Sequence, residues 1–132
     1  MDQSKCNALK AELADQEEPQ IIPIERFFDG NDDAGSIGCN LTEHPGMNVF
    51  RDVLTGLLRR SDVQAVYAQI AELDAGEDCW PFTDTVVVIG SITPDDLREA
   101  VSVLDPDDVA STNDYSELAQ KHGAQALFVW WD

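Results

Sequence analysis

Carboxylate and amide side chains alternate in one glycine-rich stretch of this 132-residue sequence. Asp29, Asn31 and Asp33 occupy positions 1, 3 and 5 of a calcium-loop pattern, an alternation that directs oxygen ligands at one ion. The rest of the pattern is missing, because Ala34 stands where a sharp turn needs glycine and Asn40 stands where a bidentate glutamate is needed. The alternative is a run of turns in which Asp and Asn side chains accept hydrogen bonds from nearby backbone N–H groups. A metal ion held here would have Asp29, Asn31 and Asp33 as its expected ligands.

Two further patterns in the same stretch could support chemistry. Cys39 and His44 lie five residues apart, and a thiol paired with an imidazole is a nucleophile where the two groups meet in space. The neighbouring carboxylates disfavour a thiolate, so a half-buried structural cysteine is the expected role of Cys39. The glycines Gly35 and Gly38 could present N–H groups to an anion, but no clear strand precedes them and no helix follows at once, so they do not form a phosphate-binding loop.

Residues 27–46 form an unusually long connection and are the candidate binding segment. Compact domains usually join their elements with about 4 to 6 residues, and connections beyond about 12 to 15 residues tend to be functional or disordered. The residues expected to contact a ligand are Phe28, Asp29, Asn31, Asp32, Asp33, Ser36, Asn40 and His44. No catalytic residue is predicted, because no set of side chains defines a reaction.

The sequence is strongly acidic, with 26 Asp and Glu residues against 8 Lys and Arg residues and a formal net charge of -18. A surface of this charge repels nucleic acid and anionic membranes, so neither is an expected partner. It attracts metal ions and basic proteins, and a basic protein is the expected partner. Dense carboxylates also favour solubility, including in a salty cell interior, so the charge has an explanation without any partner.

The cysteines and the apolar segments predict a cytoplasmic protein. Cys6, Cys39 and Cys79 are odd in number and form no C-x-x-C pair, so neither a disulfide framework nor a zinc knuckle is expected. The N-terminal residues lack the apolar stretch of a signal peptide, and no segment approaches 18 apolar residues. No cofactor is predicted.

Several elements of the N-terminal half can be predicted from the apolar spacing. Residues 1–18 are expected to be a tail or a frayed helix that Pro19 ends. Residues 21–24 are expected to be extended, and residues 25–28 to form one helical turn. Apolar residues recur every three or four positions over 47–58, which predicts an amphipathic helix.

The C-terminal half predicts strands that alternate with helices. Residues 63–73 fit a strand or a helix, and β-branched and aromatic residues favour the strand. Residues 85–90 are continuously apolar, which predicts a central strand covered on both faces. A helix is expected from Thr93 through Leu104, because Thr at the N-cap and Pro at the next position start helices well. A short helix over 115–121 and a final strand over 126–131 complete the pattern.

These elements predict an α/β (α+β) fold in which helices pack on a small mixed sheet. The strand, helix and strand from residue 85 to residue 131 suggest a right-handed crossover with two parallel strands. Residues 19–132 are expected to form a single domain after the N-terminal segment. Trp130 and Trp131 are expected on opposite faces of their strand, and residues 79–82 are expected to fold back onto the sheet.

Four short motifs make the chain resemble a family of small acidic bacterial proteins of uncharacterised function. They are Phe27-Phe28-Asp29-Gly30-Asn31, Gly35-Ser36-Ile37, Asp62-Val63-Gln64-Ala65-Val66 and Val129-Trp130-Trp131-Asp132. The resemblance covers most of the chain after residue 20. It implies no particular activity, substrate or catalytic residue.

Three functions fit these features. The preferred one is a non-enzymatic protein-binding domain, of the acidic inhibitor or immunity type, that covers a basic partner with its acidic surface and with residues 28–40. The second is a small metal-dependent or hydrolytic enzyme that uses the segment from Asp29 to His44. The third is a structural domain without a ligand.

Overall fold

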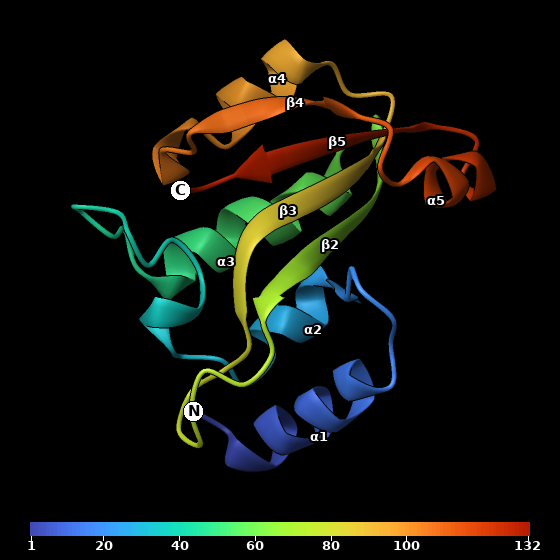
Figure 1. The fold of residues 1–132 in the computed structure, drawn as a ribbon. Helices are drawn as coiled ribbons and strands as arrows, with labels where there is room; N and C mark the ends of the chain where they lie inside the picture. Colours follow the sequence, from blue (N-terminus) through green and yellow to red (C-terminus); the bar gives the residue numbers. More distant parts are fainter.

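Five strands form one sheet: β1 (Ile21–Pro23), β2 (Val63–Glu72), β3 (Phe82–Gly90), β4 (Asp108–Thr112) and β5 (Gln125–Trp130). The computed structural model describes residues 1–132. The strands lie side by side in the order β1-β2-β3-β5-β4, and every neighbouring pair is antiparallel (Figure 1). The strand alternative for residues 63–73 is confirmed, since β2 pairs with both β1 and β3.

The helices are α1 (Gln3–Ala14), α2 (Ile24–Phe28), α3 (Met47–Gly56), α4 (Pro94–Ala100) and α5 (Ser116–Lys121), with 3-10 turns η1 (Ala34–Ser36), η2 (Leu57–Arg59) and η3 (Ser102–Leu104). As predicted, Thr93 caps α4, because its hydroxyl accepts a hydrogen bond from the Asp96 N–H group. None of these helices has the length and apolarity that a membrane crossing requires.

The two faces of the sheet differ in how they are covered. On one face, residues of α1 to α4 join the sheet in a core cluster of 26 buried residues. On the other face only α5 packs against the sheet, over a cluster of four buried residues, Val87, Ile89, Ala119 and Ala126. Residues 86–89 of β3 are fully buried and contribute to both clusters, as their continuous apolarity predicts.

The α+β class and the single domain are confirmed, but the sheet is antiparallel and not mixed. The predicted parallel pairing fails because residues 108–112, which were not predicted as a strand, form β4. β5 lies between β3 and β4 and runs antiparallel to both. β3 and β4 therefore run in the same direction without pairing, and α4 connects them across the position that β5 fills. The final strand returns from β4 through α5 instead of following α4.

The N-terminal segment is a folded helix and not a frayed one. Cys6, Leu9 and Leu13 of α1 are almost fully buried and belong to the main core cluster. Asp2 caps α1 by accepting a hydrogen bond from the Lys5 N–H group. The spacing of Leu9 and Leu13 predicted this helix, and Cys6 extends the same buried stripe by one turn.

Candidate functional site

The alternating side chains at the start of the 27–46 segment bond to their own loop. The Asn31 Oδ1 atom accepts a hydrogen bond from the Asp33 N–H group (2.9 Å), and its Nδ2 atom donates to the Ser36 hydroxyl (2.9 Å). The Ser36 hydroxyl donates to the Asp33 carbonyl (2.7 Å) and is fully buried. The Asp33 Oδ1 atom accepts from the Gly35 N–H group (3.0 Å) and caps η1. The segment therefore satisfies its backbone by turns of the kind that Asp and Asn side chains favour.

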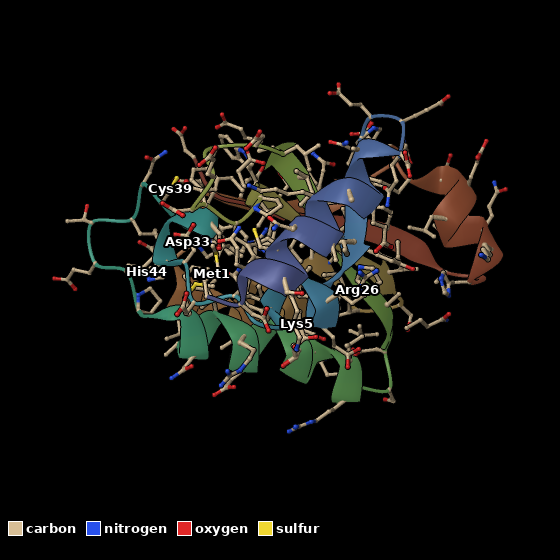
Figure 2. The ribbon with its side chains drawn as sticks, turned by 90° about the horizontal axis from the view of Figure 1, so that it is seen from below. Met1, Lys5, Arg26, Asp33, Cys39 and His44 are labelled. Atoms are coloured by element: carbon tan, nitrogen blue, oxygen red, sulfur yellow. The ribbon has the colours of Figure 1, made fainter.

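Asp29 and Asp32 point outward and pair with cations of the N-terminal segment. The Lys5 ammonium group lies 2.6 Å from Asp29, and the amino group of Met1 lies 2.7 Å from Asp32. Figure 2 shows Met1 and Lys5 at the start of α1. The hydrogen bond to Asp29 raises the pKa of Lys5, and the hydrogen bond from the amino group lowers the pKa of Asp32. These exposed ion pairs link the start of α1 to the loop, and each contributes little to stability.

The oxygen atoms of the calcium-like pattern do not converge on one point. Asp29 is directed to Lys5, whereas Asn31 and Asp33 are directed to backbone N–H groups. The described residues include no group of three or more His, Cys, Asp or Glu side chains arranged to hold a metal ion. The hydrogen bonds thus correspond to the turn alternative of the sequence pattern.

His44 closes the second half of the segment. Its Nε2 atom lies 2.9 Å from the Ile37 carbonyl oxygen, and its Nδ1 atom accepts from the Gly46 N–H group over 3.0 Å. A nitrogen that contacts a carbonyl must donate, so Nε2 is the donor atom of this ring and Nδ1 is the acceptor. The ring also lies 5.0 Å from the Phe50 ring. Both nitrogen atoms are occupied, so His44 is not available to activate the exposed Cys39 thiol.

Phe28 is a buried residue at the start of the segment. It is 6% exposed, and its ring packs edge-on against Phe27 at 5.2 Å. Its remaining surface and Asp29 line a shallow hollow between α2 and α3 that also contains Arg26, Arg51 and Arg59. Three of the eight cations of the chain thus lie at this hollow.

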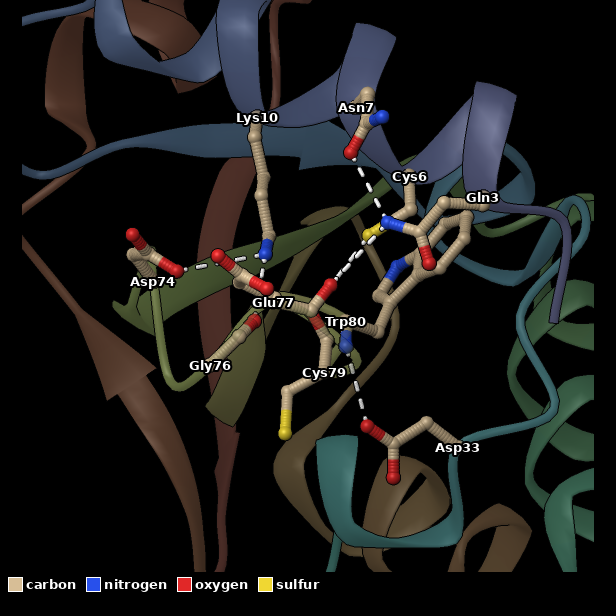
Figure 3. A network of polar contacts seen from close by, with 10 residues as sticks. All are labelled: Gln3, Cys6, Asn7, Lys10, Asp33, Asp74, Gly76, Glu77, Cys79 and Trp80. Carbon is tan, nitrogen blue, oxygen red and sulfur yellow. Dashed lines mark hydrogen bonds and ion pairs between the residues drawn. The ribbon is translucent and has the colours of Figure 1, made fainter.

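A network of polar contacts joins α1, the β2–β3 connection and the candidate segment (Figure 3). The side chains of Gln3, Cys6 and Lys10 donate to the backbone carbonyls of residues 77, 79 and 76, over 3.2, 3.5 and 2.9 Å. From the other side, the Asp33 Oδ2 atom accepts from the Trp80 N–H group over 3.1 Å. Burial raises the pKa of the Cys6 thiol, which favours the protonated form that donates this hydrogen bond. The network is structural.

Asn40, at the far end of the segment, lies on a different surface. Two adjoining hollows of about 780 and 270 Å³ share Asn40 and Asp132 among their lining residues. We call their combined surface the acidic groove. Its carboxylates are Glu43, Glu72, Asp84, Asp105, Asp107 and Asp132, and no Lys or Arg side chain lines it.

The acidic groove also contains exposed apolar side chains. Val103 is 59% exposed and Trp130 is 36% exposed, which makes them two of the three large apolar residues on the surface of the chain. Asp105, which lines the same hollow as Val103, adopts a left-handed conformation with φ of 50° that non-glycine residues rarely hold. The Asp107 carboxylate accepts a hydrogen bond from the Asp132 N–H group (2.6 Å), which fixes one side of the groove.

The comparisons with known proteins identify a family. The profile of the family described as "Uncharacterized protein YfbO family" matches residues 4–129 of the chain. The chain belongs to this family. A relative, the uncharacterized protein YfbO of Escherichia coli (strain K12), is 23% identical over 117 residues, which cover 85% of this chain and 82% of the relative. No solved structure matches the chain.

The YfbO family match spans α1 from its second residue, the 27–46 segment and all five strands except the last residue of β5. It confirms the resemblance to an uncharacterised bacterial family that the short motifs suggested. It adds no activity or ligand.

The structure thus divides the eight predicted ligand-contacting residues into three groups. Asn31, Asp33, Ser36 and His44 make the hydrogen bonds that shape the loop. Phe28, Asp29 and Asp32 lie toward α1 and the hollow beside α3. Only Asn40 lines the acidic groove. The other groove residues were missed because they come from separate parts of the chain. The acidic run 105–108 and the exposed member of the Trp130-Trp131 pair were the available signals.

Proposed function

We propose that the chain binds a basic protein and that the acidic groove is the binding surface. The observation that carries this proposal is the lining of the groove, in which six carboxylates surround exposed apolar side chains and no cation neutralises them. Lys and Arg side chains of a partner would meet complementary charge there. An inhibitor or immunity-type role, in which an acidic surface covers a basic one, has this requirement.

The apolar members of the groove give the proposed interface its anchors. Protein interfaces commonly combine a few aromatic or aliphatic anchors with a polar rim, and tryptophan is among the residues that contribute most to binding. Trp130 and Val103 fit this role, because each is exposed beside carboxylates. The hollow that contains Phe28 and Asp29 is less suitable, because Arg26, Arg51 and Arg59 would repel a basic partner.

The test compares two doubly substituted proteins of equal net charge. Glu43→Gln with Asp105→Asn removes two carboxylates of the groove, and Asn tolerates the left-handed conformation of residue 105. The control, Asp52→Asn with Glu117→Gln, removes two exposed carboxylates outside the groove. Each immobilised protein is exposed to a cell lysate at low and high salt, and retained proteins are quantified by mass spectrometry.

We expect wild type and control to retain the same basic protein at low salt and to release it in about 0.5 M NaCl, where charges more than a few ångströms apart are screened. The groove variant should retain it about tenfold less, since each exposed ion pair contributes up to about 1 kcal/mol. As an independent footprint, the bound protein should slow alkylation of the exposed Cys39 thiol, which lines the groove, while the buried Cys6 stays unreactive throughout. Retention that ignores salt, or that is equal in both variants, would contradict the proposal.

A further inference from the structure

The hollow between α2 and α3 gathers arginines in a chain that has few cations. Three of the five arginines, Arg26, Arg51 and Arg59, line this hollow, whose volume is about 780 Å³. Arg51, Thr55 and Arg59 recur at every fourth position, so they lie on one face of α3 and of η2, which continues it. We call this surface the arginine hollow. Helix geometry therefore places two guanidinium groups along the same wall.

The guanidinium groups of Arg51 and Arg59 keep most of their donors free. Arg59 has no ion pair and no side-chain hydrogen bond, although the chain carries 26 Asp and Glu residues. Arg51 uses only its Nε atom, in an exposed contact of 3.3 Å with Asp52. Arg26 is more fully engaged, since it donates to Glu12, and neither Glu12 nor Asp52 lines the hollow. A guanidinium group has five N–H donors in one plane, so Arg51 and Arg59 can each offer a pair of donors to an oxyanion.

Two carboxylates also line the arginine hollow, and only one of them lacks a cation. Asp29 lies 2.6 Å from the Lys5 ammonium group, whereas Glu25 makes no ion pair. Most of the remaining negative charge of the chain acts from farther away, and salt at physiological strength screens charges beyond about 8 Å. An oxyanion bound to a guanidinium group would lie about 3 Å from it, where screening is far weaker. For a ligand in the hollow, the arginines therefore outweigh the distant carboxylates.

The arginine hollow also has an apolar floor. Phe28, which is 6% exposed, and the half-buried Leu58 are its two apolar lining residues. Small-molecule sites usually have volumes of about 300–1,000 Å³ and combine apolar walls with a few polar groups that orient the ligand. The arginine hollow has these components, but it is shallow, so a ligand would keep part of its surface in water.

We propose that the arginine hollow binds a small organic phosphate. The phosphate oxygens would accept hydrogen bonds from Arg51 and Arg59, and the organic part would lie against Phe28 and Leu58. A phosphate monoester carries up to about two negative charges and has three terminal oxygens around phosphorus, so it can meet guanidinium groups from different directions. A carboxylate has one charge and two oxygens in one plane, which suits a single guanidinium group. Several arginines at one hollow therefore favour the phosphate.

The test titrates the full chain with phenyl phosphate, which joins a phosphate group to an apolar ring. Exposed ion pairs contribute little individually, so we expect a dissociation constant of about 1 mM, and a titration to about 20 mM would approach saturation. Two-dimensional proton–nitrogen NMR spectra at constant ionic strength report which backbone N–H groups shift. The shifts should concentrate at the residues of the arginine hollow. Benzoate and phenol, which replace the phosphate by a carboxylate and by a hydroxyl group, should each bind at least about tenfold more weakly.

Three substitutions distinguish local contact from overall charge. Arg59→Gln should weaken binding of phenyl phosphate about fivefold, the contribution expected of an exposed ion pair. Lys121→Gln removes the same charge from α5, at another exposed cation without an ion pair, and should bind as wild type does. Glu25→Gln removes the unpaired carboxylate of the hollow and should tighten binding about twofold. All three side chains are exposed, so the variants should fold as wild type does, which circular dichroism verifies.

This binding is separate from the proposed binding of a basic protein. The groove variant, Glu43→Gln with Asp105→Asn, should bind phenyl phosphate as wild type does, because neither residue lines the arginine hollow. An absence of shifts at about 20 mM phenyl phosphate, or equal weakening by Arg59→Gln and Lys121→Gln, would overturn the inference. So would benzoate or phenol that binds as tightly as phenyl phosphate, since the hollow would then select a carboxylate or only an apolar ring.

Discussion

Asp33 joins two segments that are 47 residues apart in the sequence. One carboxylate oxygen caps η1 through the Gly35 N–H group, and the other accepts from the Trp80 N–H group of the β2–β3 connection. Removal of the carboxylate leaves both donors without this acceptor in a partly buried place.

We expect Asp33→Ala to lower the free energy of unfolding by about 1–3 kcal/mol, the cost of leaving buried donors unpaired. Asp32→Ala is the matched control, because the neighbouring carboxylate is exposed and contacts only the amino group of Met1. It should change the stability little. Urea unfolding of both variants measures the difference. Equal effects at the two positions would mean that Asp33 does not connect the segments.

For individual residues, the sequence limited the possible roles to a few but did not show which role each residue has. The spacing of Asp29, Asn31 and Asp33 suits both metal ligands and turn-forming side chains, because both roles need oxygen atoms on alternate residues, although Ala34 and Asn40 depart from the calcium pattern. What separates them is the direction of each side chain. That direction depends on Lys5 and Trp80, which no local pattern connects with the loop.

The strands β2 and β3 approach each other closely at one glycine. Gly90 ends β3 beside the residues that open β2, and a Cβ atom there would lie 2.2 Å from the Asp62 carbonyl oxygen. The same oxygen accepts hydrogen bonds from the N–H groups of Ser91 and Ile92. Neither backbone can move away without breaking these bonds.

Gly90→Ala should therefore destabilise the fold by about 3 kcal/mol or more, as overpacking against fixed backbone does. Gly56→Ala is the contrasting variant, since Gly56 is helical and a Cβ atom there meets nothing within 4 Å. It should stabilise the protein by about 0.5–1 kcal/mol. Thermal melts of both variants test whether the two changes in stability have opposite signs. A mild effect of Gly90→Ala would show that the two strand ends can separate.

The ion pair between α1 and α2 should make stability depend on pH. Arg26 donates to Glu12 over 2.6 Å, and this bond lowers the pKa of Glu12 below its ordinary 4.5. A carboxylate with a lowered pKa in the folded state stabilises that state above its ordinary pKa, and the contribution disappears as the pH falls through the lowered value. Both side chains are 48% exposed, so the contribution is below about 1 kcal/mol.

Glu12→Gln should thus be slightly less stable than wild type at pH 7, and the difference should disappear as the pH falls through the lowered pKa of Glu12. Glu17→Gln, at an exposed glutamate without an ion pair, serves as the control and should follow wild type at every pH. Chemical unfolding across the acid range gives the comparison. A Glu12→Gln deficit that persists unchanged in acid would assign the effect to packing.

Elements with strong local signals could be predicted, and β4 could not. The amphipathic stripe of α3, the capped start of α4 and the apolar run of β3 each carry their pattern within a few residues. β4 is five residues long, mostly polar or acidic, and only Val109 is buried. It is a strand because β5 pairs with it, and not because of its own composition.

At the scale of the whole molecule, the fold class could be predicted from the sequence, whereas the order of the strands in the sheet could not. The amino-acid composition and the alternation of strands and helices were sufficient to predict a single α+β domain. The order of strands did not follow, because it depends on which edge accepts the last strand, and the missing β4 left β3 as the only visible neighbour of β5. The acidic groove shares this origin, since its walls come from the loop at Asn40, the turn at Asp105 and the ends of β3 and β5.

The position of β5 between β3 and β4 has a consequence during synthesis. A ribosome releases β3 and β4 before β5, yet the two are not neighbours in the folded sheet, because β5 lies between them. A sheet of β1, β2 and β3 that formed before β5 emerged would have a long, apolar and unpaired edge at β3. Such an edge is a template for pairing with other chains. The interval between release of β3 and release of β5 is when this protein is most exposed to aggregation, and the strong negative charge of the nascent chain opposes such encounters throughout that interval.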